Sequence, residues 1–202
     1  TQAMSSAASD VYKRQYYSSI VNRNTEGFTM SDIWVISDTH FNHDAILTFK
    51  DYAGKPPRGG FTDVNHMNET MLDNWTSVVK PNDTVIHCGD VLFGHNKVDW
   101  LLANFAKLPG KKRLVLGNHD NLKFLSPFFK DVQMWIDMSD IGLLFSHTPQ
   151  HASTLAESHR FGKGPILNVH GHIHSNPSPE GPYKCVCVEQ INYTPINIEE
   201  LV

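Results

Sequence analysis

The 202-residue sequence has only three cysteines, Cys88, Cys185 and Cys187, and no two of them have the CxxC spacing. A disulfide framework or a zinc ribbon is therefore not expected, and buried free thiols in a reducing compartment are the simplest interpretation. The sequence also lacks any apolar run approaching the ~18 residues that are needed to cross a bilayer. No membrane-spanning helix is predicted.

The sequence also has no strong excess of positive or negative charge. The sequence has 17 Lys and Arg residues against 21 Asp and Glu residues, which gives a formal net charge of −4. So mild a charge argues against a chain-wide electrostatic grip on nucleic acid, without excluding a local basic patch. The hydrophobic content of 40% and the charged content of 19% are those of a globular protein, and the length suits one domain with a buried core.

The first 29 residues differ from the rest. They show no sustained apolar period and no long capped element, and the stretch SSAASDVYKRQ resembles translated sequencing-adapter read-through. We therefore expect residues 1–29 to be a leader that is disordered or was introduced by sequence assembly. The expected single domain covers residues 30–202, with Met30 as the expected natural start.

From Ile33 onward, short apolar runs alternate with helical patterns. Strands are predicted at IWVIS, TVIHC and RLVLG, with one helix at about 63–79 capped by Thr62, a second after Asn96, and a short one near 122–129. This order predicts a parallel α/β first half. The second half, with VQMWIDM and IGLLFS as a hairpin and later strands at ILNV, KCVCVE and TPINIE, is expected to be antiparallel.

Polar residues that can bind metals follow these strands. DTH, GD and GNHD come after the first three, and SH and HGHIH come after strands of the second half. Because the carboxyl ends of parallel strands lie along one edge of a sheet, these side chains are expected to converge there. Imidazole and carboxylate groups without thiolates suit a pair of divalent transition metals, with Asp90 as the candidate bridge.

In order, DTH, GD, GNHD, SH and GHIH resemble the motifs of the calcineurin-like metallophosphoesterase superfamily over about residues 38–174. The resemblance implies two packed mixed β-sheets flanked by helices, and two divalent ions of manganese, iron, zinc or nickel, with manganese expected in vitro. The ligands that it implies for one ion are Asp38, His40, Asp90 and His174. Those that it implies for the other are Asp90, Asn118, His147 and His172.

The resemblance further implies that His119 is not a ligand but protonates the leaving oxygen or stabilises charge on the phosphoryl group. It implies that Asp120 orients the His119 imidazole, although Asp120 could instead cap the following helix. Candidate substrate contacts are Asn42, His43, Arg160 and Lys163, each of which could equally be a solvated loop residue. The loop at 54–60, with its two cations, is a further candidate for binding a phosphate.

The implied activity is hydrolysis of a phosphoric ester by a hydroxide held between the two metal ions, in the cytoplasm of a bacterial or phage-infected cell. After GD the sequence continues VLFGHN, and its third motif ends in Asp, whereas the protein-phosphatase branch has GDxVDRG and GNHE. We therefore expect a phosphodiesterase acting on small or nucleotide substrates. The alternatives are a phosphomonoesterase, a DNA or RNA nuclease, and a non-catalytic binding module stapled by metals. The oligomeric state stays open.

Overall fold

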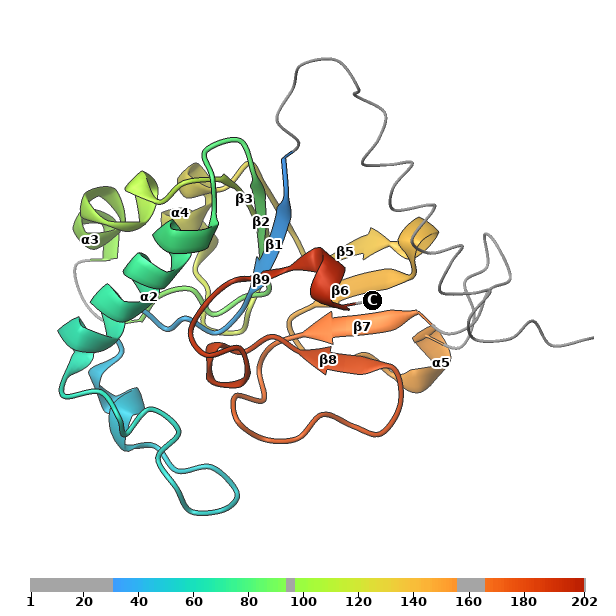
Figure 1. The fold of residues 1–202 in the computed structure, drawn as a ribbon, viewed down its shortest axis with the longest axis horizontal. Helices are drawn as coiled ribbons and strands as arrows, with labels where there is room; N and C mark the ends of the chain where they lie inside the picture. Colours follow the sequence, from blue (N-terminus) through green and yellow to red (C-terminus); the bar gives the residue numbers. More distant parts are fainter. Residues whose placement is uncertain (1–30, 94–96, 156–165, 202) are drawn as a thin grey trace, which may run out of the picture.

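A computed structural model of the protein describes residues 31–93, 97–155 and 166–201. Two β-sheets pack face to face, and helices lie outside them (Figure 1). This arrangement confirms the predicted fold class of two mixed sheets flanked by helices. The expectations for the leader, for Asn96 as a helix cap and for Arg160 and Lys163 lie outside the described residues.

The first sheet has five strands in the order β4–β3–β2–β1–β9. Its central strands are β1 (Ile33–Ile36), β2 (Thr84–His87) and β3 (Lys111–Val115), which run parallel as predicted. β4 (Asp131–Gln133) extends the sheet in parallel, and β9 (Ile196–Asn197) pairs antiparallel with β1. The carboxyl ends of β1, β2 and β3 therefore lie at one edge.

The described α-helices of the first half are α2 (Val64–Val78), α3 (Lys97–Ala103) and α4 (Leu122–Leu125), and they lie on the outer side of the first sheet (Figure 1). The predicted cap of α2 is wrong by one residue. Asp63, not Thr62, is the N-cap, and its carboxylate accepts the backbone N–H of His66. Short 3-10 turns occur at η2 (Asp44–Thr48), η3 (Phe105–Lys107), η4 (Ser126–Phe128), η5 (Ser139–Ile141), η6 (Val188–Gln190) and η7 (Ile198–Leu201).

The second sheet has the order β5–β6–β7–β8. β5 (Trp135–Met138) and β6 (Leu143–Ser146) form the predicted hairpin. The expectation that the whole second half is antiparallel is wrong, because β7 (Leu167–His170) runs parallel to β6 and β8 (Tyr183–Cys185) runs parallel to β7. Parallel neighbours need long crossover connections, and the one between β6 and β7 contains α5 (Ala152–Leu155).

The segment VQMWIDM was expected to be one strand, but it forms two. β4 belongs to the first sheet and β5 to the second, and Met134, which is largely exposed, separates them. The chain thus passes from one sheet to the other within a single residue. Alternation of polar and apolar residues cannot reveal such a step, because both pieces are extended.

Two cores hold the layers together, since neighbouring side chains of a strand point to opposite faces. The helix–sheet core joins α2 and α3 to one face of the first sheet through residues that include Trp75, Leu101, Ile36, Val85 and Leu114. The inter-sheet core joins the other face to the second sheet through residues that include Val35, Ile86, Val115, Phe145 and Val169. This packing fixes the edge of the first sheet against the matching edge of the second.

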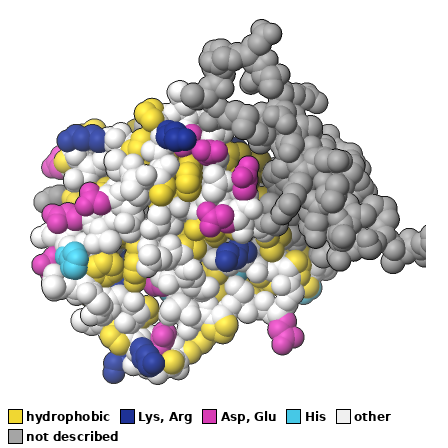
Figure 2. All heavy atoms as spheres, in the orientation of Figure 1, with side chains coloured by type: hydrophobic (Ala, Val, Ile, Leu, Met, Phe, Trp, Pro, Cys, Tyr) yellow, Lys and Arg dark blue, Asp and Glu magenta, His cyan; other side chains and the backbone are white. Residues whose placement is uncertain are grey.

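Acidic and basic side chains are interspersed on the face of the molecule shown in Figure 2, where they form no broad patch of one sign. Within the described ranges, no helix combines the length and the apolar character that a bilayer crossing requires.

Phe105 provides a test of the helix–sheet core. Its ring is fully buried and lies against the rings of Phe41, Trp75 and Phe129. We expect Phe105→Ala to lower the free energy of unfolding by about 3–5 kcal/mol, measured by urea denaturation of the metal-free protein. Leu102→Ala, three residues earlier in the chain and 57% exposed, should change it by less than about 0.5 kcal/mol. Equal losses in both variants would contradict this packing.

Candidate metal centre

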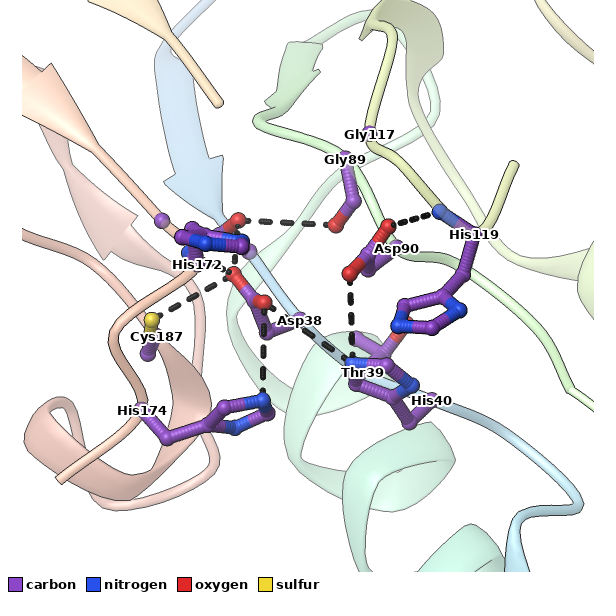
Figure 3. Close-up of polar contacts among 12 residues, drawn as sticks. Asp38, Thr39, His40, Gly89, Asp90, Gly117, His119, His172, His174 and Cys187 are labelled. Carbon is purple, nitrogen blue, oxygen red and sulfur yellow. Dashed lines mark hydrogen bonds and ion pairs between the residues drawn. The ribbon is translucent and has the colours of Figure 1, made fainter. Parts of the chain in front are cut away.

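Side chains from loops of both sheets converge beyond the strand ends (Figure 3). They form two groups in which one potential ligand atom of each residue lies within 4.8 Å of the others. The first group is Asp38, His40 and His174. The second group is Asp90, His147 and His172. Asn118 joins the second group, since its Oδ1 lies 2.9 Å from Nε2 of His147.

Asp90 lies between the two groups. Its Oδ2 is 3.5 Å from Nε2 of His40 and 3.4 Å from Nε2 of His147. Its Oδ1 instead accepts the backbone N–H of His119 at 2.8 Å. One oxygen of Asp90 therefore fixes the carboxylate to the chain, and the other faces both groups, as a shared ligand must.

The two carboxylate oxygens of Asp38 also have different partners. Its Oδ2 accepts from Oγ of Ser37 at 2.5 Å, from the backbone N–H of His172 at 2.8 Å and from Sγ of Cys187 at 3.3 Å. Burial raises the pKa of Cys187 well above its usual value, so the thiol stays protonated and can donate. Oδ1 faces Nε2 of His40 at 3.8 Å and Nε2 of His174 at 3.9 Å.

These residues fit a pair of divalent cations. Oδ1 of Asp38 and both ring nitrogens of His40 are buried without a hydrogen-bond partner among the described residues. Buried polar atoms nearly always have a partner, and a buried charge needs compensation. Oxygen and imidazole donors without thiolate ligands are a set that zinc, iron and manganese accept. Two of these atoms, Oδ1 of Asp38 and Nε2 of His40, face each other within the first group at 3.8 Å.

The electrostatics of the centre favour positive charge at this place. Burial by itself raises the pKa of the Asp38 carboxyl, but the imidazoles of His40, His147 and His174 hold the pKa well below its usual range. The pKa of Asp90 is also lowered, because His147 and the His119 N–H outweigh its burial. Burial lowers the pKa of His147, yet the two carboxylates raise it to about 9. Both carboxylates are therefore ionised and demand cations.

The backbone at five of the predicted ligands is strained. Asp38, His40, Asp90, His172 and His174 all have left-handed φ, between 45° and 71°. Non-glycine residues rarely adopt this region, and each such residue costs on the order of 1 kcal/mol or more. These sharp turns lie in the loops that follow β1, β2 and β7.

His87 and Thr39 connect the loops that carry these turns through a chain of hydrogen bonds. The Gly89 N–H donates to Nδ1 of His87 at 3.2 Å, so the ring proton is on Nε2, which donates to Oγ1 of Thr39 at 3.0 Å. Thr39 in turn donates to the Val91 carbonyl at 2.8 Å. Burial lowers the pKa of His87 to about 3, which keeps the ring neutral in this role.

His119 lies beside the two groups without belonging to either. Its exposed imidazole has a centroid 5.6 Å from that of His40 and 5.5 Å from that of Phe93. Its backbone N–H donates to Oδ1 of Asp90 at 2.8 Å. The ring is therefore free to meet a molecule that is bound at the centre.

Asp120 has a different role from either one considered from the sequence. Its Oδ2 accepts the N–H groups of Gly117 at 2.8 Å and Asp90 at 2.9 Å, and its Oδ1 accepts that of Val91 at 2.9 Å. With both oxygens on backbone donors, Asp120 joins the GD loop to the GNHD loop instead of orienting the His119 ring. The cap of α4 is Asn121, whose side chain accepts the Lys123 N–H.

The predicted substrate contacts are placed as follows. Asn42 is paired with Asn68 through two hydrogen bonds, of 2.7 Å between side chains and 3.1 Å from the Asn42 N–H. His43 is buried and stacks on Phe93 with a centroid distance of 4.1 Å. Burial and the charges of His40 and Arg58 lower the pKa of His43 to about 4. His43 thus borders the centre as a neutral ring.

Arg58 and Glu189 are the residues that the sequence did not reveal. The loop at 54–60 was expected to offer its cations to a phosphate, but the Arg58 side chain is fully buried and bonds to Glu189. Arg58 is therefore unavailable to a substrate. Oε1 of Glu189 lies 2.8 Å from Nδ1 of the predicted ligand His174. Positions 58 and 189 are 131 apart in the chain, and no spacing rule connects them.

The layered α/β fold, with two adjoining groups of metal-binding side chains at the ends of its strands, is the architecture of a metal-dependent enzyme. The family model of calcineurin-like phosphoesterases matches residues 31–201, and the chain belongs to this family. The protein is thus a metal-dependent phosphoesterase, as the order of its motifs indicates.

Several proteins are similar to this chain in sequence or in structure. An uncharacterized protein of Methanocaldococcus jannaschii is 33% identical over 181 residues, which cover 86% of this chain and 91% of that protein. The gene 66 protein of Mycobacterium phage D29 is 27% identical over 72% of this chain and 80% of its own. A crystal structure of a protein of unknown function from Aquifex aeolicus has a TM-score of 0.60 and 28% identity, and covers 85% of this chain and 97% of its own.

Gly171 tests how closely the two sheets approach at the centre. A Cβ at this position would overlap Oδ2 of Asp38 and Oγ of Ser37. We expect Gly171→Ala to displace Asp38 and to weaken metal binding about 10–100-fold, the range found when the partners of ligands are disturbed. Isothermal titration of the metal-free protein with Mn²⁺ measures this. Gly60→Ala, where a Cβ meets no atom within 4 Å, should bind as the wild type does, and an unchanged affinity in Gly171→Ala would refute the expectation.

Proposed function

We propose that this metal-dependent phosphoesterase is a phosphodiesterase that acts on small or nucleotide phosphodiesters. The observation that carries the proposal is an aromatic cluster, Phe49, His43 and Phe93, which reaches His119 at the rim of the metal centre. A phosphodiester carries a second organic group, and an apolar aromatic border beside the reacting phosphate offers that group a contact. A monoester has only one such group and gains less.

The chemistry divides between the centre and its neighbours. Two divalent cations held by the seven predicted ligands would supply Lewis-acid activation of the phosphate and of water. Asp90 and Asp38 provide the negative charge of the centre, each held in place through one oxygen. His119, whose exposed ring lies beside His40 and Phe93, would give a proton to the leaving oxygen.

The charge of the substrate also favours a diester. A monoester dianion is commonly held by arginine, whose planar fork matches phosphate. Arg58, from the loop that was the candidate for this task, instead has its side chain bonded to Glu189 and to backbone carbonyls. A diester carries one negative charge less and depends less on such a side chain.

Long nucleic acid is a weaker candidate. Neutralising several phosphates needs a band of Lys and Arg, whereas acidic and basic side chains mix on the face in Figure 2 and the net charge is −4. A small or nucleotide diester needs no such band.

The proposal is tested by comparing bis-p-nitrophenyl phosphate with p-nitrophenyl phosphate after loading with Mn²⁺. We expect faster turnover of the diester, complete loss with a chelator, and a decrease in kcat of ~10²–10⁴-fold in His119→Asn. The variant should still bind two ions, because His119 belongs to neither group. The control, His66→Asn, alters an exposed histidine of α2 and should leave kcat unchanged.

Each other outcome points to a different function. Preference for the monoester would indicate a phosphatase, and cleavage of plasmid or single-stranded DNA at similar efficiency would indicate a nuclease. Two bound ions without turnover of the diester, the monoester or DNA would indicate a non-catalytic binding module.

The aromatic cluster makes a separate prediction about specificity. Phe49 is 53% exposed and meets the His43 ring edge-on at 5.4 Å. Phe49→Ala should raise KM for bis-p-nitrophenyl phosphate about fivefold, equivalent to ~1 kcal/mol of aromatic contact, and leave kcat nearly unchanged. Tyr52→Ala, 90% exposed on the following turn, is the matched control. An equal rise in KM for the monoester and the diester would show that the cluster does not read the second ester group.

A further inference from the structure

We propose that Arg58 and Glu189 are a buried positioning pair that fixes His174 as a ligand, and that the first group of the metal centre, Asp38, His40 and His174, depends on this pair while the second group does not. The inference rests on the metal dependence within the proposed function, but not on the identity of the substrate. It assigns two residues that lie outside the five motifs to the assembly of one of the two metal sites.

A single oxygen makes the link. Oε1 of Glu189 accepts from Nδ1 of His174 at 2.8 Å and from Nε of Arg58 at 2.7 Å. Because Oε1 accepts from the guanidinium of Arg58, which can only donate, it is also the acceptor in the bond to His174. The neutral ring of His174 must therefore carry its proton on Nδ1, which leaves Nε2 without a proton and turned towards Oδ1 of Asp38 (Figure 3). This is the tautomer that a metal ligand needs.

Arg58 extends the link to the other ligands of the same group. Its two terminal nitrogens donate to the carbonyls of Thr39 at 2.9 Å and Asp38 at 2.5 Å. The DTH loop after β1 and the GHIH loop after β7 are thus fastened to one guanidinium. The side chains of Arg58 and Glu189 are 0% and 3% exposed, so removing either one leaves an unpaired buried charge.

The backbone of His174 is held independently of this pair. Nε2 of Gln190 donates to the His174 carbonyl at 2.6 Å and to the Asn176 carbonyl at 2.9 Å. Loss of Glu189 should therefore release the His174 ring while the loop keeps its place. This separation makes Glu189 a positioning residue for one side chain rather than a brace for the whole loop.

The second group uses a different device. Nδ1 of His147 bonds to the main-chain carbonyl of Cys88 at 2.8 Å, a partner that no side-chain substitution removes. The two groups therefore respond differently to mutation of the pair. Changes at Arg58 and Glu189 should affect one ion selectively.

The test is calorimetric titration of the full-length, metal-free protein with Mn²⁺. The wild type should bind two ions. Glu189→Ala should keep one site and weaken the other ~10–100-fold, as expected for loss of the carboxylate behind a ligand histidine. In the double variant R58M/E189Q, the amide oxygen can still accept from His174 and no buried charge is left unpaired, so the second ion should bind more tightly than in Glu189→Ala. Its affinity should stay below that of the wild type, because the bonds of Arg58 to the Thr39 and Asp38 carbonyls are lost.

Two measurements separate positioning from a general structural effect. The ¹⁵N shifts of the His174 ring in the metal-free protein should show the proton on Nδ1 in the wild type and in R58M/E189Q, and a mixture of tautomers in Glu189→Ala. The matched controls are two single variants, Arg113→Met and Asp131→Ala. They remove an ion pair of similar length, 3.0 Å, which is partly exposed on the first sheet. These controls should bind both ions as the wild type does.

The proposal is overturned if the wild type carries the ring proton of His174 on Nε2, if Glu189→Ala weakens both ions equally or neither, or if the folded double variant binds the second ion no more tightly than Glu189→Ala does. Should Glu189→Ala not fold, the wild-type tautomer and the double variant decide. None of these measurements involves a phosphate ester, so a failure of the proposed diesterase activity would leave them readable.

Discussion

The centre depends on two ionised carboxylates buried where strands end. Asp38 is fully buried and Asp90 nearly so, and a carboxylate removed from water is stable only with hydrogen bonds and opposite charge around it. Each one assigns one oxygen to donors from the chain and turns the other towards imidazoles. The loops around them serve this requirement, either by donating to the fixed oxygen or by carrying the imidazoles.

The packing of the two sheets offsets the free-energy cost of this arrangement. Val35, Ile86 and Val115 of the first sheet meet Phe145 and Val169 of the second in a continuous apolar core, and the five strained ligand turns lie at its edge. Strain of this kind persists only where the surrounding structure over-determines it. Outside the core, the side chains of Asp120 and His87 accept backbone N–H groups and so help to fix the loops.

The local part of this organisation could be predicted from the sequence, and the non-local part could not. Each motif sits directly after an apolar run, so strand-end placement predicts that Asp38, Asp90 and His147 meet. The parallel order of β6, β7 and β8 depends on which strands pair, which apolar patterns leave open. The role of Asp120 depends on backbone N–H groups made available by loop geometry. Glu189 follows a strand with no sign that its partner is 131 residues away.

The described part of the chain has three cysteines, all free, yet the metal centre supplies another means of joining its layers. Asp38 and Asp90 follow strands of the first sheet, while His147, His172 and His174 follow strands of the second. An ion held by both sets bridges the sheets, and any ligand that binds only the folded state stabilises it in proportion to its concentration. Metal supply would then govern how long each molecule survives proteolysis in the cell, and hence its abundance, as well as how fast it works.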